Sequence, residues 1–141
     1  VVALGNARQK ARDAKRVSDI KQIQSALDLY ATEKGGYPTL AAPKALGEDL
    51  KCLDDSATGL VASCTAEAVK FMGTVPAHPT SAGDVSYTYT SPAACVTAGA
   101  GTTCTDYTIT FRLEGTTGDL KNTDATATID CSATSAGITC S

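Results

Sequence analysis

The six cysteines are the residues of this 141-residue chain with the clearest chemistry. An even number of cysteines favours disulfide bonds, although six cysteines can pair in many ways. One pairing joins sequence neighbours and closes three short loops, each of which would stabilise the fold by roughly 2–3 kcal/mol. These pairs are Cys52–Cys64, Cys95–Cys104 and Cys131–Cys140.

A zinc site is the other common use of several cysteines. The chain has no Cys-x-x-Cys pair, and its single histidine, His78, is far in sequence from any cysteine pair. The ligand spacing of a structural zinc site is therefore missing. Disulfides imply an oxidising compartment, such as the periplasm, the cell surface or the exterior, so the sequence predicts an exported protein.

Residue patterns for catalysis are weak. His78 lies in a proline-flanked stretch, no Gly-x-Ser-x-Gly motif occurs, and oxidised cysteines offer no thiolate nucleophile. The acidic pairs Glu48-Asp49 and Asp54-Asp55 are expected in loops, where carboxylates are more often solvated than catalytic. The sequence therefore predicts that the protein is not an enzyme and binds no cofactor. An ordered cleft around His78 is the observation that would argue for catalysis.

Basic side chains gather near the start of the chain. Residues 1–21 carry six basic side chains against two acidic ones, although the whole chain has a net charge of −3, so the remainder is acidic. This asymmetry suits DNA, anionic lipid or a complementary neighbouring copy, and it also fits a solvated helix face. DNA has little support, because the pI is about 5.0 and no aromatic residues interleave with the basic ones.

Residues 1–34 have the pattern of one long helix. Apolar side chains recur every three or four positions, good helix formers dominate, and neither Gly nor Pro interrupts from Asn6 to Lys34. Gly35-Gly36 and Pro38 then end the helix. The apolar stripe consists of Leu4, Ala7, Ala11, Ala14, Val17, Ile20, Ile23, Leu27 and Tyr30.

This stripe changes in character along the helix. Its first half is almost entirely alanine, whereas large side chains follow from Val17 onward. Large residues suit packing against a core, and small ones suit the close approach of another helix. We therefore expect residues 1–14 to project from the domain and residues 15–34 to pack on it.

The rest of the chain divides into two regions. Residues 35–84 read as an irregular connection with turns, and a short helix is predicted over residues 65–72. From residue 85 to residue 141 the apolar period changes to two, which indicates β-strands. The strands are expected at residues 85–90, 107–113 and 125–129, with a fourth around Ile138.

These elements predict an α+β fold in one globular domain. A long N-terminal helix would pack on a three- to four-stranded antiparallel sheet, and the disulfides would staple the loops between strands. The aromatic content is only 5% and tryptophan is absent, so the core is expected to need this covalent support.

The segment from Ala7 to Tyr30, closed by Gly35-Gly36-Tyr37-Pro38, resembles the region after the transmembrane part in bacterial type IV pilins and type II secretion pseudopilins. Tyr30 at the end of the helix and the Gly-x-Tyr-Pro exit are the most specific parts of this match. The later Val75-Pro76-Ala77-His78-Pro79, followed by Tyr87-Thr88-Tyr89, resembles the family's Pro-x-Asp-Pro and Tyr-x-Tyr motifs. His78 stands there in place of the usual aspartate.

The resemblance implies a structural subunit of a type IV pilus-like filament, with a type II secretion pseudopilin as the alternative. An apolar, methylated N-terminal half-helix would precede Val1, anchor the subunit in the inner membrane and later form the filament core. The partners would be other copies of the chain and the pilus assembly machinery, and the filament would lie at the cell surface. A secreted or surface binding module, for DNA or another ligand, is the alternative from a different class.

The resemblance also implies roles for two sets of charged side chains. Basic residues of the helix would meet acidic surfaces of adjacent copies and set the subunit register, unless they merely flank the membrane segment. The major pseudopilins bind calcium in their C-terminal loop, and this chain has acidic residues in that region but no dense acidic loop, so the sequence predicts no metal site and leaves calcium as an alternative. The expected subunit contacts are Arg8, Lys10, Arg12, Lys15 and Arg16, and the calcium candidates are Glu114, Asp119, Asp124 and Asp130.

Overall fold

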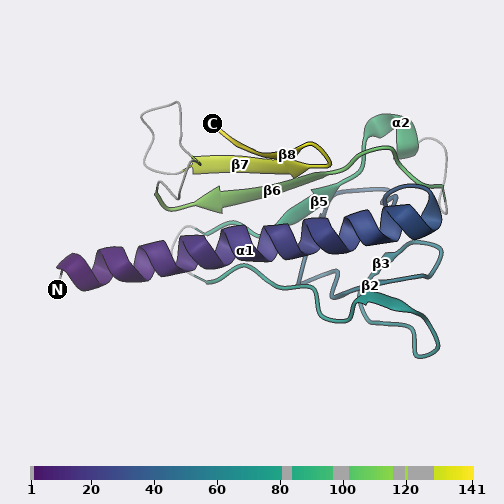
Figure 1. The fold of residues 1–141 in the computed structure, drawn as a ribbon, viewed down its shortest axis with the longest axis horizontal. Coiled ribbons are helices and arrows are strands. Elements are labelled where there is room, and N and C mark those ends of the chain that lie inside the picture. The colour runs from purple at the N-terminus through teal and green to yellow at the C-terminus, as the bar shows by residue number, and fades with distance from the viewer. Residues whose placement is uncertain (1, 81–83, 97–101, 116–119, 121–128) are drawn as a thin grey trace.

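A single long helix, α1 (Val2–Lys34), begins the fold and runs along the molecule, with its first turns extending beyond the strands (Figure 1). The computed structural model describes residues 2–80, 84–96, 102–115, 120 and 129–141. The predicted long helix is confirmed. Gly35, with a φ of 82°, adopts the left-handed conformation at which the helix ends, and its N–H donates to the carbonyl of Ala31.

The main sheet has five strands and is antiparallel throughout. Its strands are β1 (Lys44–Ala45), β5 (Thr88–Thr90), β6 (Thr108–Leu113), β7 (Ile129–Thr134) and β8 (Gly137–Cys140). Their order is β1-β5-β6-β7-β8, so the expected meander is present and β1 extends it at one edge. The α+β class is thus confirmed, although the sheet has more strands than the three or four predicted.

One predicted strand differs from the structure in extent, and most of another lies outside the described residues. The first, expected over residues 85–90, is shorter and spans only β5. The third was expected over residues 125–129, and residues 121–128 lie outside the described part of the chain. The strand expected around Ile138 is β8, which forms a hairpin with β7.

A second, smaller sheet occupies the connecting region. It consists of β2 (Cys52–Asp54), β3 (Leu60–Val61) and β4 (Lys70–Met72), in the order β3-β2-β4. The helix predicted over residues 65–72 is therefore wrong, because its last residues form β4 and pair with β2.

Side chains of β2 and its neighbour explain why no helix forms there. The buried carboxylate of Asp54 accepts the N–H of Thr65 at 3.0 Å, and that of Asp55 accepts the N–H of Val69 at 3.0 Å. In the expected helix the N–H of Val69 would have donated to the carbonyl of Thr65, but it is bound instead to the Asp55 carboxylate. Local propensity thus yields to tertiary contacts in this segment.

The three disulfides join sequence neighbours, as predicted. They are Cys52–Cys64, Cys95–Cys104 and Cys131–Cys140. The first two close loops of the connecting and central regions, Cys95 lying in the short helix α2 (Ala93–Val96). The third lies within the β7–β8 hairpin, where Cys131 and Cys140 are cross-strand partners.

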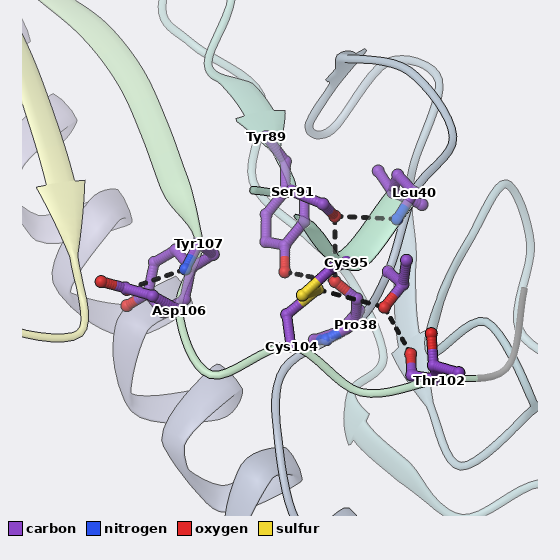
Figure 2. Close-up of a disulfide and its surroundings, with 10 residues drawn as sticks. Pro38, Leu40, Tyr89, Ser91, Cys95, Thr102, Cys104, Asp106 and Tyr107 are labelled. Atoms are coloured by element: carbon purple, nitrogen blue, oxygen red, sulfur yellow. Dashed lines mark hydrogen bonds between the residues drawn. A yellow bond between two sulfur atoms is a disulfide. The ribbon is translucent and has the colours of Figure 1, made fainter. Parts of the chain in front are cut away.

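The Cys95–Cys104 disulfide lies beside the exit from α1 (Figure 2). Tyr37 and Cys104 exchange two backbone hydrogen bonds, at 2.8 and 2.9 Å. The carbonyl of Pro38 accepts the buried hydroxyl groups of Tyr89 and Ser91, both drawn in Figure 2. These bonds attach the segment after the helix to the sheet that the helix covers.

The core surrounds the second half of α1, which packs on the inner face of the main sheet and also on the smaller sheet. The strands contribute alternate residues, such as Ile109, Phe111 and Leu113 of β6, as period-two patterning requires. From the helix, large side chains point toward them. Those buried from α1 are Ile20, Ile23, Leu27 and Tyr30. Among the described residues, no helix combines the length and apolar composition that crossing a membrane requires.

Candidate functional site

Charged side chains, not apolar ones, join the first half of α1 to the sheet. Arg16 has only 1% of its side chain exposed, and its guanidinium contacts three carboxylates. The nitrogen–oxygen distances are 2.7 Å to Glu114, 2.8 Å to Asp13 and 2.9 Å to Asp84. We call this cluster the ionic junction, which comprises Arg12, Asp13, Arg16, Asp84 and Glu114.

Asp13 connects the helix to the end of β6. Its side chain is buried, and its two oxygens accept the backbone N–H groups of Glu114 and Gly115, each at 2.9 Å. These two hydrogen bonds and the contact with Arg16 offset the cost of removing the carboxylate from water. Asp13 therefore determines where the strand end lies against the helix.

Glu114 completes the junction from the side of the strand. Arg12 binds it with two nitrogens, each 2.7 Å from a different carboxylate oxygen. Hydrogen bonds from Arg12, with further bonds and charge from Arg16, lower the pKa of Glu114 to about 2. For Arg16, burial disfavours the charged form, but bonds to Glu114 and Asp84 outweigh it and raise the pKa.

A second buried carboxylate of α1 follows nearly two turns further along the helix. Asp19 accepts the hydroxyl of Tyr87 at 2.9 Å and pairs with Lys15 at 2.6 Å. Burial first, and the charge of Asp19 second, raise the pKa of Tyr87. The phenol therefore stays protonated and acts as a donor that ties α1 to the segment before β5.

These contacts revise the expected subunit contacts. Arg16 lies inside the chain and cannot face a neighbouring copy, which corrects that expectation. Arg12 is committed to Glu114, and Lys15 pairs with Asp19 while remaining exposed. Arg8 and Lys10 are exposed on the projecting turns.

The boundary between the projecting and the packed parts of α1 moves accordingly. The expectation was that residues 1–14 project, but Asp13 is buried, with 1% exposure. Packing therefore begins about half a helical turn earlier than predicted. The reason is that charged residues of the first half are paired inside the fold and do not require solvent.

His78 lies at the edge of the ionic junction, in an arrangement that has the order of a Ser-His-Asp triad. Its Nδ1 is 3.0 Å from Asp84, and its Nε2 is 3.4 Å from the hydroxyl of Ser86. However, a second carboxylate, Glu48, is 2.8 Å from Nε2 and accepts the Ser86 hydroxyl at 2.8 Å. The Ser86 hydroxyl therefore donates its proton to Glu48 and not to the imidazole, as a catalytic triad would require.

The two carboxylates that contact His78 favour its charged form, and in that form the ring cannot act as a base. Burial disfavours its charged form, but the hydrogen bond and charge of Asp84, and the bond to Glu48, outweigh burial and raise the pKa. An imidazolium has no lone pair with which to accept a proton from Ser86. The contacts around His78 are those of a charged bridge.

The calcium candidates are not brought together in the described part of the chain. Glu114 is bound by two arginines of the ionic junction, and Asp130 pairs with Arg112 at 2.7 Å. Asp119 and Asp124 lie outside the described residues. Over the described ranges, no group of three or more His, Cys, Asp or Glu side chains could hold a metal ion.

The outer face of α1 carries a shallow hollow of about 490 Å³. Small and polar side chains form it, whereas the large apolar ones point toward the sheet. It continues the alanine row of the projecting turns, since Ala7, Ala11 and Ala14 are all exposed. The residues that line the hollow are Ala14, Val17, Ser18, Lys21, Gln22 and Ser25.

Comparisons of the chain with family models, curated proteins and solved structures found no match. Its function is therefore inferred from the sequence and the geometry alone.

Proposed function

We propose that this chain is a structural subunit of a type IV pilus-like filament and assembles through α1. The observation that carries the proposal is a row of small side chains on the exposed face of this helix. The row begins on turns that extend beyond the strands (Figure 1) and continues over the packed half. We call it the outer row, which consists of Ala7, Ala11, Ala14, Ser18 and Ser25.

The spacing of the outer row supports packing against another helix. Its members recur at intervals of three, four or seven residues, which keeps them on one face of a helix that winds around a neighbour. Small side chains allow helix backbones to approach closely, so that dispersion contacts between them become numerous.

The remainder of the proposal follows from the resemblance to pilins. An apolar segment before Val1 would hold the subunit in the inner membrane before assembly and form the filament core afterwards. Other copies of the chain and the pilus assembly machinery would be its partners, and the filament would reach the cell surface. Arg8 and Lys10 remain available to meet acidic surfaces of adjacent copies.

A bulky substitution in the outer row tests this proposal in cells that produce the natural protein. Ala14→Leu should reduce the yield of sheared filaments by roughly tenfold, because overpacking of a close helix contact costs about 1–3 kcal/mol. Filaments would be counted by electron microscopy and by immunoblotting of the sheared fraction. The thermal midpoint of the soluble domain should stay unchanged, since Ala14 is exposed.

The matched control is Ala66→Leu, which makes the same change at an exposed alanine away from α1. Its filament yield should equal that of the unmodified protein. Equal yields for Ala14→Leu and Ala66→Leu would remove the outer row as an assembly surface. The absence of any filament containing the unmodified protein would refute the proposed function itself.

A further inference from the structure

Four side chains of alternating charge form a line from α1 to the turn after β1. Arg16 lies 2.9 Å from Asp84, Asp84 lies 3.0 Å from Nδ1 of His78, and Nε2 of His78 lies 2.8 Å from Glu48. The four come from three segments that are far apart in sequence. Only 13% of the His78 side chain is exposed, so water competes poorly for its nitrogens.

The surroundings of His78 contain more acidic than basic groups. The turn after β1 contributes Glu48, and the segment before β5 contributes Asp84, Ser86 and the ring of Tyr87, edge-on at 6.1 Å. Two charged residues of α1 are one contact further away from the imidazole. Arg16 donates to Asp84, and Asp19 accepts the Tyr87 hydroxyl. Two carboxylates therefore touch the imidazole directly, whereas the nearest arginine touches only one of them.

The two contacts of His78 require two N–H donors. A neutral imidazole has a single N–H and can donate to Asp84 or to Glu48, but not to both. A protonated imidazole donates to both and supplies the positive charge that separates them. The bridge across His78 can therefore exist only while the ring carries its second proton.

The turn that Glu48 belongs to is seated on the core by two buried leucines, Leu46 and Leu50, while Glu48 itself points away from the core and is half-exposed. It follows the two-residue strand β1, and the N–H of Leu46 donates to the carbonyl of Tyr87 at 2.7 Å. Gly47, with a φ of 80°, packs so closely on the backbone of Ala77 that a Cβ there would lie 2.4 Å from an Ala77 atom. This close fit holds only while the turn remains against the segment that carries His78.

We propose that His78 is a proton-controlled clasp that fastens the turn at residues 46–50 to the segment that carries His78 and loosens this contact when the ring loses its proton. Loosening would weaken the hydrogen bond from Leu46 to Tyr87, where β1 meets the edge of β5, while the buried side chains of Leu46 and Leu50 keep the turn on the core. This inference goes beyond the proposed filament function and does not depend on it.

The direction of the pH effect follows from the raised pKa of His78 in the folded chain. A group whose pKa is raised on closing stabilises the closed state fully below its ordinary pKa of 6.5. That stabilisation is lost as the pH rises through the raised value. The clasp is thus closed in mild acid and opens toward alkaline pH.

Two measurements on the unmodified domain test the clasp. Because His78 is the only histidine, its ring protons give a single NMR titration, and its pKa should exceed 6.5. In parallel, amide exchange at Leu46 should report opening of the turn. Its protection, corrected for intrinsic exchange, should fall roughly three- to tenfold between about pH 6 and about pH 9. The Cys104 amide, which donates to Tyr37, is a reference that should not change.

Two variants separate the clasp from a general effect of pH. Glu48→Gln, at a half-exposed position, keeps the shape of the side chain and should lower the pKa of His78. His78→Asn should give low Leu46 protection at both pH values. If Glu48→Gln leaves the pKa of His78 unchanged, or if Leu46 protection is equal at both pH values in the unmodified domain, the clasp is refuted. If His78→Asn fails to fold, the test remains decisive, because the two measurements on the unmodified domain do not need that variant.

Discussion

The two halves of the buried face of α1 pack in opposite ways. Toward its end, Ile23 and Leu27 lie in an apolar core between the helix and the main sheet. Toward its beginning, the same face carries Asp13 and Arg16, which are just as buried. One helix therefore meets one domain through hydrocarbon at one end and through ion pairs at the other.

This difference teaches how the two halves respond to change. Apolar packing loses stability in proportion to the volume removed, because each side chain contributes largely through its own contacts. In a buried ionic cluster, the loss of one partner leaves the others charged, dehydrated and unpaired. The ionic junction should therefore be the less tolerant half, even if its net contribution to stability is small.

The largest effect is expected from Arg16→Ala in the ionic junction. It would leave the carboxylates of Asp13, Asp84 and Glu114 without their shared cation, and should lower the free energy of unfolding by about 4 kcal/mol. Urea unfolding followed by circular dichroism measures this. The control is Arg112→Ala, which breaks the exposed pair with Asp130 and should cost less than about 1 kcal/mol. Similar losses for the two variants would contradict the distinction between buried and exposed pairs.

A somewhat smaller loss is expected from Leu27→Ala in the apolar half. The side chain is fully buried, so the substitution leaves a cavity and should cost about 3 kcal/mol. Creating this cavity involves no ionisable group. The loss in the free energy of unfolding should therefore be the same at about pH 7 and about pH 4. A pH-dependent loss for Leu27→Ala would show that the two halves are coupled and not separable.

The smallest effect is local and arises in acid. The pKa of Glu114 is lowered to about 2 from an ordinary value of 4.5, so its contribution is full above pH 4.5 and is lost as the pH falls toward 2. Amide exchange at Glu114 and Gly115, whose N–H groups donate to Asp13, should accelerate roughly tenfold over this range beyond the intrinsic change. Exchange at Ala26 should follow only the intrinsic change, and equal acceleration at all three amides would indicate global unfolding instead.

Much of the fold could be predicted, because local patterns express it. The helix follows from its apolar spacing and its glycine exit, and the strand β6 follows from strict alternation. Neighbour pairing of the cysteines succeeded because short loops and hairpins bring such residues together. The second sheet could not be predicted, since its strands of two or three residues depend on carboxylates of Asp54 and Asp55 that bind distant N–H groups.

The ionic junction was missed for a different reason. The large apolar residues of α1 lie at 20, 23, 27 and 30, and the same spacing carried backward falls on Asp13 and Arg16. The expected stripe followed the alanines instead, because charged residues are usually placed on the solvated side. The helical spacing thus indicated that Asp13 and Arg16 lie on the buried face. Their partners Asp84 and Glu114 are distant in sequence, so the sequence alone could not identify them.

One consequence of the disulfide pattern concerns how tension travels through the molecule. All six cysteines follow residue 51, and α1 contains none of them. The helix is joined covalently to the rest only through Gly35, at its far end. A stretching load on the first turns therefore passes into the side-chain contacts of Asp13 and Arg16 before it reaches any crosslink. Under such a load the helix would shear away from the sheet while each stapled loop kept its length, so the ionic junction would break before any disulfide bore the load.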